Sequence, residues 1–193
     1  MSLKILGGLA NSRSLFVPKG DLIRPTSIRL KRRLFDSRQD WSGKTFIDLC
    51  AGSGAIGIEA WSRGAEGLVL NEANKKVGIT LKKNIELLKS EYSDEFIDRP
   101  IRSFNMKAEE WLKTYEHDDR LDVVVFLDPP YHLKKVYEKC IGTLRSNSFV
   151  GELLIESDRQ KGPKQEELEQ LVGHAPIKVY EQGTSFIQVF KLN

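Results

Sequence analysis

Short apolar runs alternate with amphipathic segments from residue 41 to the end of the chain. Runs rich in β-branched and aromatic residues predict strands, and apolar residues spaced by three or four positions predict helices. A first strand begins at Thr45, and later strands are predicted at 67–71, 101–105, 121–127, 152–156, 176–181 and 185–192. Helices are predicted at 55–63, 75–89, 108–115, 133–146 and 164–172, with loops at 90–100 and 117–120. This alternation predicts an α/β fold with a doubly wound, mainly parallel sheet that ends at one edge in an antiparallel pair.

The same pattern predicts which side chains are buried. Residues 121–127 are almost all apolar, as in a parallel strand that is covered on both faces. The helix at 75–89 presents one apolar face, made of Val77, Leu81, Ile85 and Leu88. In the helix at 133–146, the residues expected to be buried are Leu133, Val136, Tyr137, Cys140 and Leu144.

Residues 1–40 are predicted to form a separate extension in front of a domain that covers residues 41–193. A hairpin is expected within residues 3–17, with 14–17 as its return strand, followed by a turn at 18–21. A helix then runs to about Arg38, with Thr26 or Ser27 as its cap. Its spacing places Arg29, Arg32 and Arg33 on one face and Leu30 and Leu34 on another.

Charge is unevenly distributed along the chain. The whole protein carries a formal charge of only +3. Residues 1–44 hold ten Lys/Arg and three Asp, a balance of +7, and the remainder has a balance of −4. A basic end on a nearly neutral protein indicates either a polyanionic partner or a solvated charged segment, and charge alone does not separate the two.

The stretch 45–59 carries the first chemical signal. It begins apolar, passes through four small residues at 51–54, and continues as a helix. Gly52, Gly54 and Gly57 form the pattern G-x-G-x-x-G at this strand-to-helix turn, where glycine lets a ligand approach bare backbone. Glu72 follows Gly52 by 20 positions and comes after the next predicted strand. Its carboxylate can there accept both ribose hydroxyls of an adenosine-containing cofactor.

The glycine pattern by itself is shared by dinucleotide sites, S-adenosylmethionine (SAM) sites and ordinary tight turns. Asp48 favours SAM, because a carboxylate four residues before Gly52 can meet a cationic amino group but repels a pyrophosphate. The residues expected to hold this part of SAM are Asp48, Ala51, Gly52, Ser53 and Gly54, with Glu72 on the ribose.

Residues 128–131, Asp-Pro-Pro-Tyr, form a second constellation directly after the predicted strand 121–127. Ligands of doubly wound sheets bind at this edge. The prolines fix φ and remove two donors, so their carbonyls are expected to face outward without competing N–H groups. Asp128 and the Pro129 carbonyl can then grip one exocyclic NH₂ and aim its lone pair at a sulfonium methyl. Tyr131 offers a flat face on which a base removed from its helix can stack. A structural Pro-Pro turn is the alternative.

Composition narrows the class of protein. The chain has 193 residues, 40% of them hydrophobic and 30% charged, which is typical of a soluble globular protein. No apolar run approaches the ~18 residues of a membrane span, and no signal peptide is recognised, so we expect a cytoplasmic protein that binds no membrane. Two cysteines and three histidines show neither a disulfide pattern nor a metal spacing, so no metal is expected.

These motifs, together with residues 5–8, 24–26 and 62–65, resemble the bacterial RsmD-type 16S ribosomal RNA (guanine-N2)-methyltransferases over almost the whole chain. The resemblance implies a class I SAM methyltransferase fold whose N-terminal hairpin and helix help to grip RNA. It implies that Asp128, Pro129, Pro130 and Tyr131 hold the target guanine. The residues expected to contact RNA are Arg13, Arg24, Thr26, Arg29, Arg32 and Arg33. The implied partner is 16S ribosomal RNA in a 30S subunit or an assembly intermediate, bound by a monomer.

The chain departs from this family at three positions. Ile28 and Arg32 stand where the family usually carries Asp and Glu, and Lys107 stands where Asp or Asn often reads the adenine amine. We therefore expect adenine to be recognised by backbone groups at Lys107 and Ala108. Three other functions stay open: amino-methylation of another RNA or of DNA at adenine N6 or cytosine N4, an NAD-dependent oxidoreductase, and an RNA-binding paralogue with weakened catalysis.

Overall fold

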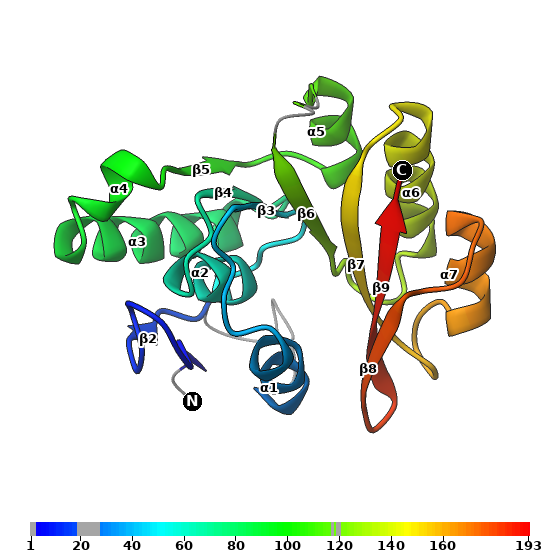
Figure 1. Ribbon diagram of the computed structural model, residues 1–193, viewed down its shortest axis with the longest axis horizontal. Helices are drawn as coiled ribbons and strands as arrows, with labels where there is room; N and C mark the ends of the chain where they lie inside the picture. The colour runs from blue at the N-terminus through cyan, green and yellow to red at the C-terminus, as the bar shows by residue number, and fades with distance from the viewer. Residues whose placement is uncertain (1–2, 19–27, 117, 119–120) are drawn as a thin grey trace.

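A seven-stranded sheet forms the centre of the computed structural model, which describes residues 3–18, 28–116, 118 and 121–193. The strand order is β5-β4-β3-β6-β7-β9-β8 (Figure 1). The strands are β3 (Lys44–Asp48), β4 (Gly67–Asn71), β5 (Ile101–Phe104), β6 (Asp122–Leu127), β7 (Gly151–Asp158), β8 (Lys178–Gln182) and β9 (Ser185–Leu192). Neighbours from β5 to β7 are parallel, whereas β9 runs antiparallel to both β7 and β8. The predicted doubly wound sheet with an antiparallel edge is confirmed.

Helices cover both faces of this sheet (Figure 1). The helices are α1 (Ile28–Ser37), α2 (Ala55–Ser62), α3 (Lys75–Glu91), α4 (Glu95–Asp98), α5 (Ala108–Thr114), α6 (Lys134–Ser146) and α7 (Gln165–Val172). Apolar residues of α1, α2 and α3 share one core with Phe46 and Phe126 of the sheet. Those of α5, α6 and α7 share a second core with Val125 and Leu153. The central strand β6 is therefore apolar on both sides, as the uninterrupted run 121–127 predicted.

Most predicted elements match, and the differences have local causes. The expected loop 90–100 contains the last residues of α3 and the short helix α4. Leu133 was expected to be buried but is 42% exposed, because it precedes α6 and lies beside a cavity instead of under the helix. Ile141 takes the buried place on α6 that the prediction omitted. The predicted turn at 18–21, the helix cap at 26 or 27 and most of the loop 117–120 lie outside the described residues.

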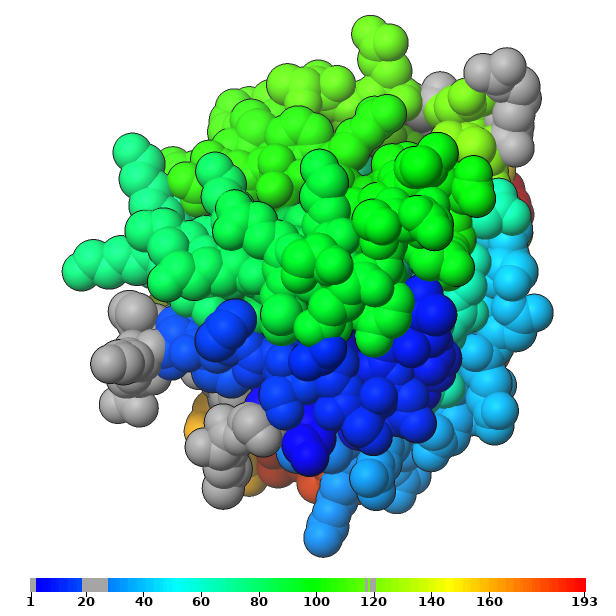
Figure 2. Space-filling view, turned by 90° about the vertical axis from the view of Figure 1, so that its left-hand side faces the viewer, coloured from blue at the N-terminus to red at the C-terminus, as the bar shows by residue number. Residues whose placement is uncertain are grey.

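The predicted N-terminal hairpin consists of β1 (Leu3–Lys4) and β2 (Ser14–Leu15). It packs against α2 and α3 of the main domain; Figure 2 shows this blue segment lying directly below the green helices. Ser62 at the end of α2 is the central contact: its carbonyl accepts the Leu9 N–H, and its hydroxyl bonds both Ala10 N–H and the Gly7 carbonyl. On α3, Asn84 exchanges two hydrogen bonds with the backbone of Phe16.

Glu59 of α2 binds two parts of the extension and the end of its own helix, and it has no exposed surface. Its carboxylate accepts the Leu6 N–H at 2.8 Å and the Arg63 Nε–H at 2.7 Å. Lys31 Nζ of α1 lies 2.9 Å from the same carboxylate. Burial lowers the pKa of Lys31, and the adjacent Glu59 opposes that shift. The hairpin, α1 and α2 therefore meet at one buried carboxylate.

Gly8 is the tightest point of this junction. It has a φ of +74°, and a Cβ placed on it would stand 1.9 Å from the Ser62 carbonyl oxygen. Gly43 has a similar φ of +76°, yet a Cβ there would meet nothing within 4 Å. The two glycines thus share a left-handed backbone conformation and differ in the space around them.

We predict that Gly8→Ala destabilises the protein more than Gly43→Ala does. Both variants place a side chain in the left-handed region, at a cost of about 1–2 kcal/mol. Gly8→Ala also forces the hairpin away from α2, which adds about 1–3 kcal/mol of overpacking. Urea unfolding of the two variants beside the wild type measures the difference, and equal free energies of unfolding would contradict the contact with Ser62.

Candidate active site

The order of the strands creates a crevice between β3 and β6. From β3 the chain proceeds outward to β4 and β5, and it then returns to the other side of β3 to form β6. Connections from the two strands diverge at such a switch point, which leaves space above their carboxyl ends. A cavity of about 1070 Å³ opens at this edge. Both the glycine turn after β3 and the Asp-Pro-Pro-Tyr segment after β6 line it.

The glycine turn is held in place by Glu72. The Gly52 N–H donates to Glu72 Oε2 at 2.9 Å, and the Asn74 N–H donates to Oε1 at 2.7 Å. Ala51, Gly52 and Ser53 line the cavity with Glu72, as predicted. Gly54 does not: it has a φ of +90°, and a Cβ there would lie 2.8 Å from Leu81 in the core. Its role is to let α2 start under the turn.

Asp48 lies at the end of β3 and is only 2% exposed. The Cys50 N–H donates to its Oδ1 at 3.3 Å, and a backbone hydrogen bond from Gly57 also favours the ionised form. Burial is the larger influence and, together with the nearby charge of Asp128, raises the pKa of Asp48 to about 8. A cation placed beside this carboxyl would reverse the shift, because it stabilises the ionised form.

Lys107 and Ala108, the residues predicted to recognise adenine, line the cavity at the start of α5. Lys107 is the N-cap of this helix and has an exposed side chain. The preceding Met106 carbonyl accepts a hydrogen bond from Asn71 Nδ2 at 3.0 Å, and the same amide nitrogen donates to the Leu49 carbonyl. Asn71 thus links the ends of β3 and β4 to the backbone in front of α5.

The Asp-Pro-Pro-Tyr segment differs from its prediction in one respect. Its carbonyls were expected to face outward without competing donors, and this is wrong. The Pro129 carbonyl accepts a hydrogen bond from the buried Tyr137 hydroxyl at 3.3 Å, and the Pro130 carbonyl accepts the Leu133 N–H at 2.8 Å. The prolines remove donors from their own residues, but α6 brings others. Asp128 is half-buried and lines the cavity.

Four charged residues of the cavity wall were not predicted: Lys31, Glu109, Glu156 and Lys161. Glu156 of β7 is 1% exposed, and the Tyr131 hydroxyl donates to its Oε1 at 3.1 Å. Lys31 of α1, paired with Glu59, also lines the cavity. An acidic residue near the carboxyl end of a predicted strand was a usable signal for Glu156. Lys31 has the i, i+3, i+4 spacing to the apolar Leu34 and Phe35, which was a signal for burial.

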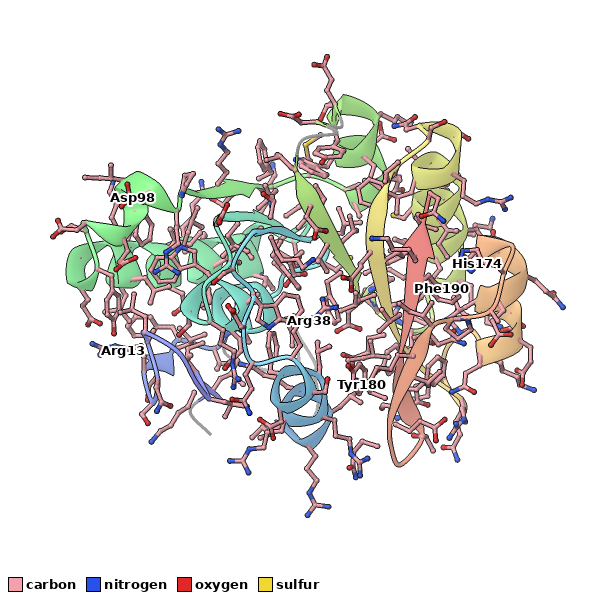
Figure 3. The ribbon with its side chains drawn as sticks, in the orientation of Figure 1. Arg13, Arg38, Asp98, His174, Tyr180 and Phe190 are labelled. Atoms are coloured by element: carbon pink, nitrogen blue, oxygen red, sulfur yellow. The ribbon has the colours of Figure 1, made fainter. Side chains whose placement is uncertain are left out.

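The described residues among the predicted RNA contacts lie outside the cavity. Arg29, Arg32 and Arg33 are exposed on α1, whose buried face holds Lys31. Arg13 forms an ion pair with Glu91 of α3 and lies on the hairpin, far from the contact of α1 with Tyr180 (Figure 3). Arg24 and Thr26 lie outside the described residues. Within the described part of the chain, no cluster of His, Cys, Asp and Glu is suited to a metal, and none of the helices is long and apolar enough to cross a membrane.

Comparisons with known proteins identify the family. The family model described as Conserved hypothetical protein 95 matches residues 3–190. The ribosomal RNA small subunit methyltransferase D of Haemophilus influenzae is 33% identical over 77% of this chain and 73% of its own length. The enzyme of the same name from Escherichia coli K12 is 32% identical over 83% of this chain and 77% of its own length.

Solved structures support the fold. The 16S rRNA N2 methyltransferase RsmC of T. thermophilus, in complex with AdoMet and guanosine, superposes with a TM-score of 0.67. It is 18% identical, and the match covers 100% of this chain and 50% of that one. At this identity the likeness concerns the fold, which is the class I SAM methyltransferase fold that the sequence predicted. With the family match over residues 3–190, the chain belongs to the Conserved hypothetical protein 95 family, the RsmD family of the resemblance.

Proposed function

We propose that this protein transfers a methyl group from SAM to the exocyclic N2 amine of a guanine in small-subunit ribosomal RNA. One observation carries the proposal: the glycine turn after β3 and the Asp-Pro-Pro-Tyr segment after β6 line the same cavity. The names of the relatives, ribosomal RNA small subunit methyltransferase D, support the substrate class. We take the substrate to be 16S RNA in a 30S subunit or an assembly intermediate, and the protein to act as a monomer in the cytoplasm.

The residues of the cavity fit SAM better than a dinucleotide. Asp48 and Asp128 place two carboxyl groups at its centre, and Asp48 can ionise beside a cationic ligand but gains nothing from a pyrophosphate. Each Glu72 oxygen accepts one backbone N–H and keeps a further lone pair for a ribose hydroxyl. The volume of about 1070 Å³ is at the upper end of ligand pockets and leaves room for a base beside the cofactor.

When bound, SAM supplies a methyl group on a cationic sulfur, and the C–S bond breaks to leave a neutral thioether as the N–C bond forms. The chain positions the nucleophile. Asp128 accepts one hydrogen of the guanine amine, which turns the nitrogen lone pair toward the cofactor side of the cavity. As the bond forms, the amine becomes cationic and loses a proton to the Asp128 carboxylate, which passes it to water. Tyr131 provides the stacking surface for the base.

Asp128→Ala is predicted to lower the rate of methyl transfer by about 10²- to 10⁴-fold, because the amine loses its acceptor. SAM affinity, measured by calorimetry, is expected to stay within a few-fold. Labelled SAM offered with ribosomal RNA, 30S subunits or duplex DNA gives the rate and the substrate class. Asp122→Ala at the other end of β6 is the matched control. Equal losses of SAM binding and transfer would contradict the role of Asp128, and labelling of DNA alone would contradict the proposed substrate.

Binding of SAM is predicted to release close to one proton at pH 6.5. The carboxyl of Asp48 is protonated at this pH, because its pKa is raised to about 8. The α-amino group of SAM is cationic at this pH and forces the carboxyl to ionise. SAM affinity should therefore rise between pH 6 and pH 7. Calorimetry in buffers of different ionisation enthalpy measures the number of protons released. Asp48→Asn should abolish this release, whereas Glu72→Gln should retain it. Proton uptake by the wild type would refute the assignment.

The exposed arginines of α1 are predicted to contact phosphates. In a triple variant, Arg29, Arg32 and Arg33 are all changed to Gln. The slope of log K against log salt should become shallower by about two to three units, since each lost contact removes about 0.7–0.9. The matched control removes Lys82, Lys83 and Lys89, which are exposed on α3. Filter binding of ribosomal RNA between low and physiological salt measures both slopes, and an equal change in the two triple variants would indicate a nonspecific effect of net charge.

A further inference from the structure

A second carboxylate stands beside Asp128 at the edge of the sheet. Leu127 of β6 is the Cα partner of Ile155 of β7, so Asp128 and Glu156 occupy the next position on two adjacent parallel strands. Such strands lie about 4.8 Å apart. Phe126 and Leu154, two residues earlier, are also partners and share the core on the side of α1 and α2. Because side chains alternate along a strand, Asp128 and Glu156 extend from that same face. Both line the cavity.

The Glu156 carboxylate is connected to the surface on which the base would stack. Its Oε1 accepts the Tyr131 hydroxyl at 3.1 Å, and its main-chain carbonyl accepts the Tyr137 hydroxyl at 3.0 Å. The Tyr137 hydroxyl shares its single proton between this carbonyl and that of Pro129, so it joins the end of β7 to the Asp-Pro-Pro-Tyr segment. A carboxylate offers about four lone-pair sites, so it can accept the Tyr131 hydroxyl and a ligand donor at the same time. A base stacked on Tyr131 would thus have one edge directed at Glu156.

The chemistry of the bases decides which one this arrangement accepts. Beside its reactive amine, guanine carries N1–H, which is a second donor. Adenine and cytosine carry an acceptor nitrogen beside theirs, so a carboxylate there would face a lone pair and be repelled. An ionised carboxylate only accepts hydrogen bonds. Two neighbouring carboxylates therefore match the two adjacent donors of guanine and disfavour the other two amino bases.

We infer that Glu156 is a specificity-determining residue that accepts the N1–H of the target guanine while Asp128 accepts its N2–H. The inference rests on the proposed function and deepens it, because it assigns the choice between guanine and the other amino bases to one side chain. Sites that hydrogen-bond a substrate discriminate strongly against analogues that leave a buried group unpaired.

The test compares guanine with 2-aminopurine, which has the same 2-amine but an acceptor at N1. The methylated nucleotide is first mapped with the wild type and labelled SAM. Either base is then placed at this nucleotide by ligation of synthetic RNA. The wild type should methylate guanine with a kcat/KM at least about 10-fold above that for 2-aminopurine. Glu156→Gln should lower the value for guanine about 10- to 100-fold. Its amide can donate to the N1 of 2-aminopurine, so the rate on that base should stay unchanged. The kcat/KM ratio of guanine to 2-aminopurine should therefore fall toward one.

Two further variants separate specificity from positioning. Tyr131→Phe removes the hydroxyl that Glu156 holds, so it should slow both bases alike and keep their ratio. Glu152→Gln removes the other buried glutamate of β7, which pairs with Arg38 at the opposite end of the strand, and should leave the ratio unchanged. Melting temperature and SAM affinity are measured for every variant.

The outcomes distinguish the two levels of the proposal. If the wild type methylates no ribosomal RNA, the proposed function fails. If it methylates guanine, but Glu156→Gln slows both bases equally or neither, the inference about Glu156 fails alone. Should Glu156→Gln not fold, Glu156→Asp takes its place. This shorter carboxylate should lower the rate on guanine more than the rate on 2-aminopurine; an unchanged ratio, or equal rates of the wild type on the two bases, overturns the inference.

Discussion

The register of three parallel strands determines the character of the cavity. Phe126 of β6 is the Cα partner of both Asp48 on β3 and Leu154 on β7. Asp128 and Glu156 follow two residues later on the same face, so carboxylates from three adjacent strands meet at one edge of the sheet. A slip of one residue would turn this row toward the opposite face. The pairing of apolar residues deep in the sheet thus fixes the position of the polar groups at its edge.

A buried charge network fixes the N-terminal extension on this frame. Lys31, Glu59 and Arg63 are almost fully covered, and Glu59 also accepts the Leu6 N–H. Removing such charges from water costs much of what their attraction returns, so the network is weak evidence for stability. Its directional contacts instead define one arrangement of α1 and the hairpin. Because Leu3 and Lys31 line the cavity, that arrangement also shapes the site.

Features that depend on local sequence pattern could be predicted, whereas features that depend on tertiary contacts could not. The glycine turn, Glu72 and the Asp-Pro-Pro-Tyr segment were found because each is a short motif at a predicted strand end. Two other motifs, residues 5–8 and 62–65, were recognised separately, and only the structure shows that Gly8 packs on Ser62. The place of Glu156 beside Asp128 could be predicted only if β7 was known to neighbour β6. The hydrogen bond of the Pro129 carbonyl could be predicted only from the position of Tyr137. Neither follows from periodicity.

The proposed reaction poses an electrostatic conflict that the fold resolves by separation. An acidic cavity suits a cationic cofactor, yet it repels the phosphates of an RNA substrate. The helix α1 divides the two tasks between its faces. Lys31 points inward to Glu59 and the cavity wall, whereas Arg29, Arg32 and Arg33 are exposed to solvent. With the N-terminal balance of +7 against −4 in the remainder, phosphates can be attracted beside the cavity while only an uncharged base enters it. The carboxylates then meet N–H donors and a sulfonium, the partners that an acceptor-rich site stabilises.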